Sequence, residues 1–303
     1  MSFASLWLLL PLATAANAQE PAAAPRATAP APAPAEVDAL VAALGAPTRA
    51  ARIAAQAQLL ALPESADPLL ASAVAPAGFE AQAALDYVRA HRPRRPQACA
   101  VAGGKVRVGS SFPPDQNAPH DVELAPFTID DIEVSCFEWW RFVREAGGAA
   151  PESWRDGRYA YGAERVPVGG MTGDEARRFA QWAGGRLPTA DEWEVAAHGG
   201  TPSAYPWGPQ YEPRLQGPGQ RTWRGDGLPP ESGSEPADRA PCGAVDFCSS
   251  LSEWVVLPDG ALAVRGGNYK AGAKELLRLT RAPDRRVTRA RDVVGLRLAD
   301  RRR

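Results

Sequence analysis

Hydrophobic residues recur at helical spacing in the first third of the chain. Between residues 37 and 92 they lie three or four positions apart, in four short runs separated by Gly45, by Pro63 and by the turn at 76–78. This pattern predicts a small all-α module of helical hairpins, residues 37–92, similar to HEAT repeats. A helical cap on the next domain is the alternative interpretation. The proline- and arginine-rich stretch 91–96 predicts a linker, so we expect few contacts between this module and the rest.

A pair of matching start signals predicts two further helices. Thr172 stands three residues before Glu175, and Thr189 stands three residues before Glu192. At this spacing the threonine hydroxyl and the carboxylate can each accept a hydrogen bond from a free backbone N–H group at the helix start. The two helices are expected over residues 173–183 and 190–198.

Glycine and proline predict where these helices end. Gly184 and Gly199 each follow the last hydrophobic position, where the chain needs a left-handed residue. Pro188 prevents the first helix from continuing and keeps Leu187 extended. Two short helices joined at an angle are therefore expected.

From residue 100 onward the pattern changes to short apolar stretches interrupted by many Gly and Pro residues. Eight of the nine Trp residues lie beyond residue 138. Low regular content with many large aromatic side chains is typical of a loop-rich α+β domain, which we place at residues 100–300. The helical spacing of Phe137, Trp140 and Val143 assigns these side chains to its core.

The first 36 residues are expected to lie outside the folded part. The apolar run from Leu6 to Ala16 is too short to span a bilayer, and Ala16-Asn17-Ala18 fits a small-x-small cleavage site. Residues 1–18 are therefore predicted to be a signal peptide, which implies a periplasmic or secreted protein. Residues 19–36 are rich in Ala and Pro and predict a disordered linker. No later stretch is apolar and long enough to span a membrane.

The overall charge gives no sign of a polyanionic partner. With 34 basic and 35 acidic residues the net charge is −1, so neither nucleic acid nor an anionic membrane surface is expected to bind. Residues 278–303 hold ten arginines. A solvated basic face is the simplest interpretation of this tail.

The chain contains four cysteines, Cys99, Cys136, Cys242 and Cys248. In an exported protein they favour structural disulfides, and the sequence does not choose among the three complete pairings. No C-x-x-C pair occurs, and the three histidines lack the spacing of a metal site.

Residues 184–200, GGRLPTADEWEVAAHGG, resemble the signature block of the formylglycine-generating, sulfatase-modifying-enzyme family. Further blocks occur in the family's order, among them PHDVELAPFTID at 119–130, YPWG at 205–208 and GAVDFCSSLSEW at 243–254. The resemblance assigns a structural role to Arg186, Leu187, Pro188, Thr189, Glu192, Trp193, Trp254, Arg265, Gly266 and Gly267.

The resemblance implies a C-type-lectin-like α+β fold without the family's oxidase chemistry. Catalytic members carry two copper-binding cysteines shortly after the Arg-Gly-Gly block, and alignment from Arg265 puts these positions at Ala271 and Leu276. Copper(I) needs soft sulfur ligands, so neither copper nor formylglycine-generating activity is expected. Ergothioneine-type sulfoxide synthases pair this domain with an iron-binding helical bundle. Residues 37–92 contain only His91, so iron is not expected either.

Family members also bind Ca²⁺ in a loop that corresponds here to residues 246–253. The resemblance assigns the ligands to Asp246, to the carbonyl oxygens of Ser249 and Leu251, and to Glu253. This all-oxygen set suits a hard cation. Ser249 replaces the family's glycine, and a positive φ there would strain the loop by about 1–2 kcal/mol. The alternative is that Asp246 caps a turn and Glu253 pairs with an arginine.

Two functions remain open at this point. The chain is either an inactive family relative whose lectin-type groove binds a protein, peptide or glycan, or a periplasmic enzyme of the same fold with a different oxidative or modifying reaction. The residues alone identify neither the ligand nor the pathway.

Overall fold

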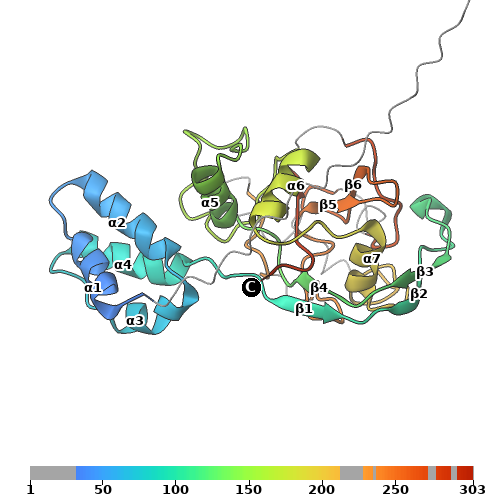
Figure 1. Cartoon of the computed structure of the whole chain (residues 1–303), viewed down its shortest axis with the longest axis horizontal. Coiled ribbons are helices and arrows are strands. Elements are labelled where there is room, and N and C mark those ends of the chain that lie inside the picture. The colour runs from blue at the N-terminus through green and yellow to red at the C-terminus, as the bar shows by residue number, and fades with distance from the viewer. Residues whose placement is uncertain (1–31, 212–227, 235–236, 272–277, 288–291, 303) are drawn as a thin grey trace, which may run out of the picture.

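The structure is a computed structural model of the chain (Figure 1). It describes residues 32–211, 228–234, 237–271, 278–287 and 292–302. The predicted signal peptide and most of the predicted linker lie outside these ranges and stay predictions. None of the helices in the described ranges has the length and apolar character needed to cross a membrane.

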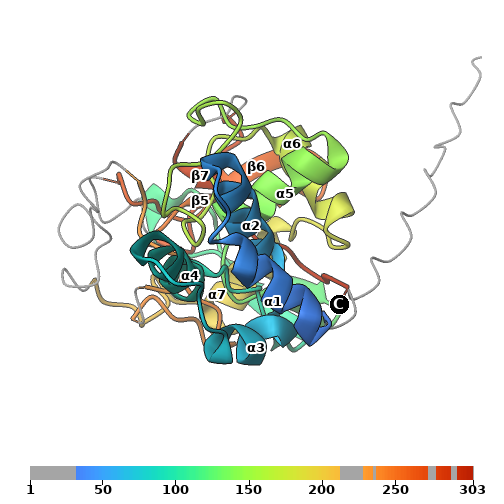
Figure 2. The ribbon, with the colours of Figure 1, turned by 90° about the vertical axis from the view of Figure 1, so that its left-hand side faces the viewer.

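The N-terminal module consists of four α-helices and one short 3₁₀ helix (Figures 1 and 2). Their bounds are α1 Pro34–Ala43, α2 Arg49–Ala61, η1 Glu64–Ala66, α3 Asp67–Ser72 and α4 Phe79–His91. Helix α1 begins inside the predicted linker, because Pro34 is tolerated in a first helical turn, where its missing N–H has no partner anyway. Buried Val41, Leu59 and Leu85 lie on three of these helices. The relation to HEAT repeats stays a prediction.

Among the described residues, the strands of the second part form three small sheets. Antiparallel pairs are β1 Ala98–Val101 with β4 Phe127–Asp130, and β2 Gly104–Val108 with β3 His120–Leu124. In the third sheet β5 Ser252–Val256 lies between antiparallel β6 Leu262–Arg265 and parallel β7 Val294–Gly295. Short strands linked by long loops agree with the predicted loop-rich α+β class.

The described residues of this part form three α-helices, and both predicted capping boxes are present. The helices are α5 Cys136–Ala146, α6 Gly173–Trp182 and α7 Ala190–His198, with η2 Pro113–Asp115 as a short 3₁₀ turn. At the start of α7, Thr189 Oγ1 accepts from Glu192 N at 3.1 Å and Glu192 Oε2 accepts from Thr189 N at 2.8 Å. Gly184 and Gly199 have φ values of 77° and 70°, as their positions after the helices predicted.

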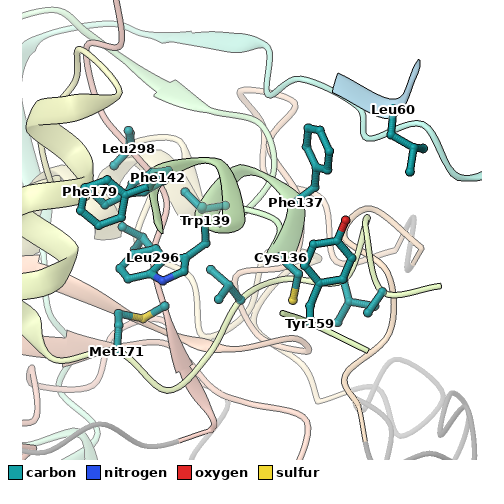
Figure 3. Packing of buried hydrophobic residues seen from close by; sticks show 14 of the residues in the cluster. Leu60, Cys136, Phe137, Trp139, Phe142, Tyr159, Met171, Phe179, Leu296 and Leu298 are labelled. Atoms are coloured by element: carbon teal, nitrogen blue, oxygen red, sulfur yellow. The ribbon is translucent and has the colours of Figure 1, made fainter. Parts of the chain in front are cut away.

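An aromatic cluster packs α5 against α6 (Figure 3). Trp139 stacks on Phe179 with 5.1 Å between ring centroids, and Phe142 meets both rings edge-on. The Trp139 indole N–H donates to the Ala149 carbonyl at 2.9 Å, so its one polar group is satisfied. Phe137 is buried, as predicted, and Trp140 is half-buried against the same cluster.

The helical module is joined to the domain more closely than the sequence predicted. Leu60 of α2 and Phe137 of α5 belong to one buried cluster (Figure 3). The Tyr87 hydroxyl of α4 donates to Glu164 Oε1 at 2.7 Å and accepts from Gly162 N at 2.9 Å. These particular contacts were not predicted, because partners more than seventy residues apart leave no signal in a local pattern.

All four cysteines are free thiols in the structure, so it contains none of the predicted disulfides. Cys136 and Cys248 are buried, where a thiol behaves as a small apolar group. Cys99 and Cys242 are half-buried neighbours, and burial together with the Cys242 thiol raises the pKa of Cys99 to about 11.

The Tyr87 hydroxyl gives a direct test of the junction between module and domain. In a Tyr87→Phe variant the buried Glu164 carboxylate loses a donor, so the free energy of unfolding should fall by about 1–3 kcal/mol. Tyr161→Phe is the matched control, because Tyr161 stacks on Tyr87 but is 76% exposed. Urea denaturation should show almost no change for the control. Wild-type stability in Tyr87→Phe would show that this hydroxyl does not hold the junction.

Candidate functional site

Ala271, which the sequence resemblance aligns with the first copper-binding cysteine, lies against apolar neighbours in the structure. Ala271 is half-buried and packs against the hydrophobic cluster that contains Trp193 and Phe247. Its N–H donates to the Asn268 carbonyl at 2.9 Å, which closes a turn after the Arg-Gly-Gly block. Leu276, the second expected position, lies outside the described residues.

Aromatic side chains pack against the same cluster as Ala271. The rings of Tyr205 and Trp207 are stacked, with centroids 5.2 Å apart and planes 3° from parallel. Tyr205 and Gly208 exchange backbone hydrogen bonds, and Gly208 has a φ of 130° that few other residues adopt. The Tyr-Pro-Trp-Gly block is therefore a tight turn that holds two rings face to face.

Arg278 is held in a fixed orientation beside these rings. Its guanidinium donates to both carboxylate oxygens of Asp115, at 2.7 and 2.9 Å, and lies 4.5 Å from the ring centre of Phe112. Burial alone would raise the pKa of Asp115, but hydrogen bonds from Arg278, Ser110 and Thr280 hold it below the ordinary value. Arg278 also interacts with Tyr205. The Arg278 guanidinium therefore lies between the exposed Phe112 ring and the buried Tyr205 side chain.

The Arg-Gly-Gly block ties loops together. Arg265 is 3% exposed, donates to the carbonyls of Leu279 and Arg281, and pairs with Glu194 at 2.9 Å. Gly266 has a φ of 84°, and a Cβ there would lie 2.9 Å from the Trp193 ring. The block therefore has a structural role, because it packs against α7.

Other motif residues occupy similar structural positions. Arg186 binds both Glu192 oxygens, at 2.6 and 2.7 Å, and also Asp300 at 2.7 Å. The Trp254 indole N–H donates to the Met171 carbonyl at 3.2 Å.

A buried ion pair lies at the centre of the domain. Arg297 contacts both oxygens of Glu253 at 2.7–2.9 Å, and neither side chain is exposed. Trp193 Nε1 donates to Glu253 Oε2 at 2.7 Å. Burial alone would lower the pKa of Arg297, but the Glu253 carboxylate raises it well above the ordinary value. Glu253 therefore pairs with an arginine, as the alternative interpretation of this residue predicted.

Three further carboxylates are buried around this pair. Glu133, Asp238 and Asp246 are at most 2% exposed. Burial raises the pKa of Asp246 to about 7, with the nearby Asp238 adding to the effect. Burial also raises the pKa of Glu133, with Asp246 and Glu253 adding to it. One guanidinium does not balance four carboxylates, so protons or a cation must supply the remaining charge.

The loop that was expected to bind calcium has free oxygen atoms. No donor among the described residues reaches the carbonyl oxygen of Ser249 or Leu251. Asp238 Oδ1 is buried and has no hydrogen-bond partner in the described part of the chain, whereas Oδ2 accepts from Cys248 N, Ser249 N and Ser249 Oγ. An oxygen-only set with excess negative charge fits Ca²⁺.

The expected strain in this loop lies at a different residue. Asp246 has a φ of 68°, and Ser249 is not among the non-glycine residues with positive φ. Aspartate tolerates the left-handed region better than most residues, because its short polar side chain can bond locally. The Asp246 carboxylate is also held from a distant segment, because it accepts a hydrogen bond from Gly233 N, thirteen residues away.

Metal-binding side chains do not gather at one point in the described ranges. These ranges contain no group of three or more His, Cys, Asp or Glu side chains that is suited to hold a metal ion. This criterion considers side chains alone, so it does not test the expected calcium loop, in which two of the four expected ligands are backbone carbonyl oxygens. His91 stacks on Tyr87, His120 is exposed and His198 is buried in α7, so the histidines do not converge.

Sequence reasoning missed Arg297 and Asp238, which complete this centre. Arg297 stands between two leucines near the C-terminus, and a lone arginine among buried apolar positions is a signal for an internal ion pair. Asp238 lies in a polar loop, where nothing local distinguishes a buried aspartate from an exposed one.

Comparison with known proteins assigns the family. The Sulfatase-modifying factor enzyme 1-like domain matches residues 84–302, which is most of the chain. The chain belongs to this family. The match begins within α4, so the family's region includes part of the helical module.

Curated relatives have different activities. The chain is 36% identical over 129 residues to the formylglycine-generating enzyme of Mycobacterium tuberculosis, covering 39% of this chain and 41% of that protein. It is 30% identical over 177 residues to the hercynine oxygenase of the same organism, covering 48% of this chain and 40% of that protein. It is 37% identical over 76 residues to the inactive C-alpha-formylglycine-generating enzyme 2 of Bos taurus, covering 25% of each. Each match spans less than half of the relative.

Among solved structures, PvdO from Pseudomonas aeruginosa matches with a TM-score of 0.52 at 21% identity, over 68% of this chain and 95% of that one. This likeness supports the α+β fold of the family.

Asp130 should make stability depend on pH. Burial raises its pKa to about 7, although Arg301 Nε lies 3.1 Å from Oδ2. In the unfolded chain an aspartate titrates near 3.9, so between about pH 4 and 7 the folded state binds more protons and stability falls as pH rises. Asp130→Asn should reduce this slope by up to about 1.4 kcal/mol per pH unit.

Urea denaturation between pH 4.5 and 7.5 measures this slope. Asp121→Asn is the control, because Asp121 is exposed and its pKa is lowered by Lys105 and Arg107. The control should leave the slope in this range unchanged. If the stability of Asp130→Asn falls with pH as steeply as that of the wild type, Asp130 is not the source of this pH dependence.

Proposed function

We propose that this protein is an exported binding or accessory module of the sulfatase-modifying factor family that does not generate formylglycine. The observation that carries the proposal is Ala271, which stands at the first copper-binding position and packs into the apolar cluster. Leu276, at the second position, likewise offers no sulfur ligand. The similarity to a relative that is itself named inactive supports the same conclusion.

The proposed ligand surface is half-buried Trp207 and exposed Phe112 together with Arg278. Tyr205 is 3% exposed and holds Trp207 in place by stacking on it. Flat rings stack on sugar or aromatic groups, and a guanidinium held by Asp115 adds a directed cation. A peptide or glycan is therefore the proposed ligand class. The periplasmic or secreted location rests on residues 1–18.

A second candidate is an enzyme with a different oxidative or modifying reaction. The 30% identity to a hercynine oxygenase favours this alternative, since that relative is named for oxygen chemistry. Stoichiometric copper or iron in the purified protein, or turnover that consumes oxygen, would support it over the binding module.

The proposal is tested by incubating the protein with copper, oxygen and a cysteine-containing sulfatase peptide. We expect no aldehyde product, because neither Ala271 nor Leu276 supplies a thiolate for copper(I). A formylglycine-generating relative assayed in parallel is the positive control. Aldehyde formation by the wild-type protein would overturn both the alignment and the inactive assignment.

We also propose that the loop 246–253 binds Ca²⁺. Asp246 and the carbonyl oxygens of Ser249 and Leu251 would hold the ion, with Glu253 as a shared partner of Arg297 and Asp238 Oδ1 as an additional oxygen nearby. The cation would neutralise part of the buried negative charge, so its main contribution would be to stability.

Calcium should raise the melting temperature of the wild-type protein relative to EDTA. At a hundredfold excess over Kd the expected rise is about 5–10 °C for a domain of this size. Asp246→Ala should lose the effect, whereas Asp259→Ala, which changes an exposed carboxylate outside the loop, should keep it. The calcium assignment fails if EDTA leaves the wild-type melting temperature unchanged and no metal co-purifies.

A further inference from the structure

A cavity of about 200 Å³ lies where the linker after α4 meets the domain. Arg94 of the linker lines one part of it, and Ser135 and Arg165 of the domain line another. The segment Glu231–Ser234 completes the wall. The cavity does not include Phe112, Trp207 or Arg278. It touches the loop 246–253 through Gly233, whose N–H donates to Asp246.

Arg165 brings an uncompensated charge to this cavity. Its Nε donates to the Arg92 carbonyl at 2.8 Å, which fixes the guanidinium. Its two Nη groups have no acceptor among the described residues. A fixed guanidinium with two open N–H groups matches the geometry of a carboxylate or phosphate group. Arg94 adds a second guanidinium, which also pairs with Asp131.

Hydroxyl groups lie beside these cations. Ser232 Oγ is buried and has no partner in the described part of the chain. A buried hydroxyl without a partner is costly, so Ser232 Oγ is free to donate to a water molecule or to a ligand that enters the cavity. Ser135 Oγ accepts from Glu138 N at 3.2 Å and keeps its own proton to donate.

The wall that carries Ser232 is held in place. Ser232 N donates to the Arg165 carbonyl at 3.1 Å, and Gly233 N donates to Asp246. Among the described residues that line the cavity, Glu231 is the only acidic one, and it is engaged in an interaction of its own. Two guanidinium groups and a buried hydroxyl therefore line this space beside one carboxylate, so cationic donors outnumber acidic side chains in the described lining.

We propose that this cavity binds a small oxyanion group, with Arg165 as its principal cation and Ser232 as a hydroxyl donor. Phosphate, sulfate and the terminal carboxylate of a peptide share the required chemistry, namely two or more anionic oxygens for the Arg165 fork. Because Arg94 belongs to the linker and Arg165 to the domain, the bound anion would bridge the two. The proposal does not depend on the ligand of the aromatic surface.

The test uses calorimetry and thermal melting of the full chain. Phosphate, sulfate and acetate are compared with chloride at equal ionic strength, and a short peptide with a free C-terminal carboxylate is compared with its amide. Binding of phosphate, sulfate or acetate supports a site for a free anion. Binding of the peptide acid but not of the peptide amide supports a site for a C-terminal carboxylate. The absence of any binding heat or melting shift beyond chloride would overturn the proposal.

Two variants and one control separate ligand binding from folding. Arg165→Gln should weaken binding about tenfold or more, as expected for a lost charged hydrogen bond. Ser232→Ala should melt like the wild type in chloride, because its hydroxyl has no partner there, but should bind the anion several-fold more weakly. Arg285→Gln, in an exposed pair with Asp259, should bind like the wild type. Wild-type affinity in both cavity variants would contradict the assignment.

Discussion

The ion pair between Glu253 and Arg297 is the interaction on which the domain depends. Removing one partner of a buried pair leaves a bare charge in the interior and typically costs 3–5 kcal/mol. The pair joins the central strand β5 to the C-terminal segment, and Trp193 brings α7 to the same carboxylate. The third sheet, helix α7 and the C-terminal segment are therefore held together by this one buried ion pair rather than by long paired strands.

In this arrangement loops form the surface that could bind a ligand. Two arginines anchor these loops from inside, since Arg265 binds the carbonyls at 279 and 281 and Arg278 binds Asp115. Loops tied at both ends to a rigid frame can present rings and charges without much loss of entropy on binding. A domain built in this way can lose its metal chemistry and keep a well-formed recognition surface, which is consistent with the different activities of its relatives.

Patterns between residues a few positions apart predicted local structure correctly. Contacts between residues far apart in the sequence could not be predicted from such patterns. The capping box of Thr189 and Glu192 depends on residues three positions apart, so the helix start could be predicted from spacing alone. The Tyr87–Glu164 bond spans 77 positions, and a proline-rich stretch between modules gave no hint of it. The strain expected at Ser249 lies at Asp246, because the loop places its left-handed residue three positions earlier than the family pattern suggested.

The C-terminal segment has a consequence for the order of folding. Arg297 is the only guanidinium, among the described residues, that bonds to Glu253, and the same segment bonds Asp130 N through the Leu298 carbonyl and supplies β7. A chain that emerges N-terminus first keeps its central carboxylates unneutralised until this segment arrives. Completion of the domain therefore waits for residues 294–298, which follow every other described strand and helix in the chain.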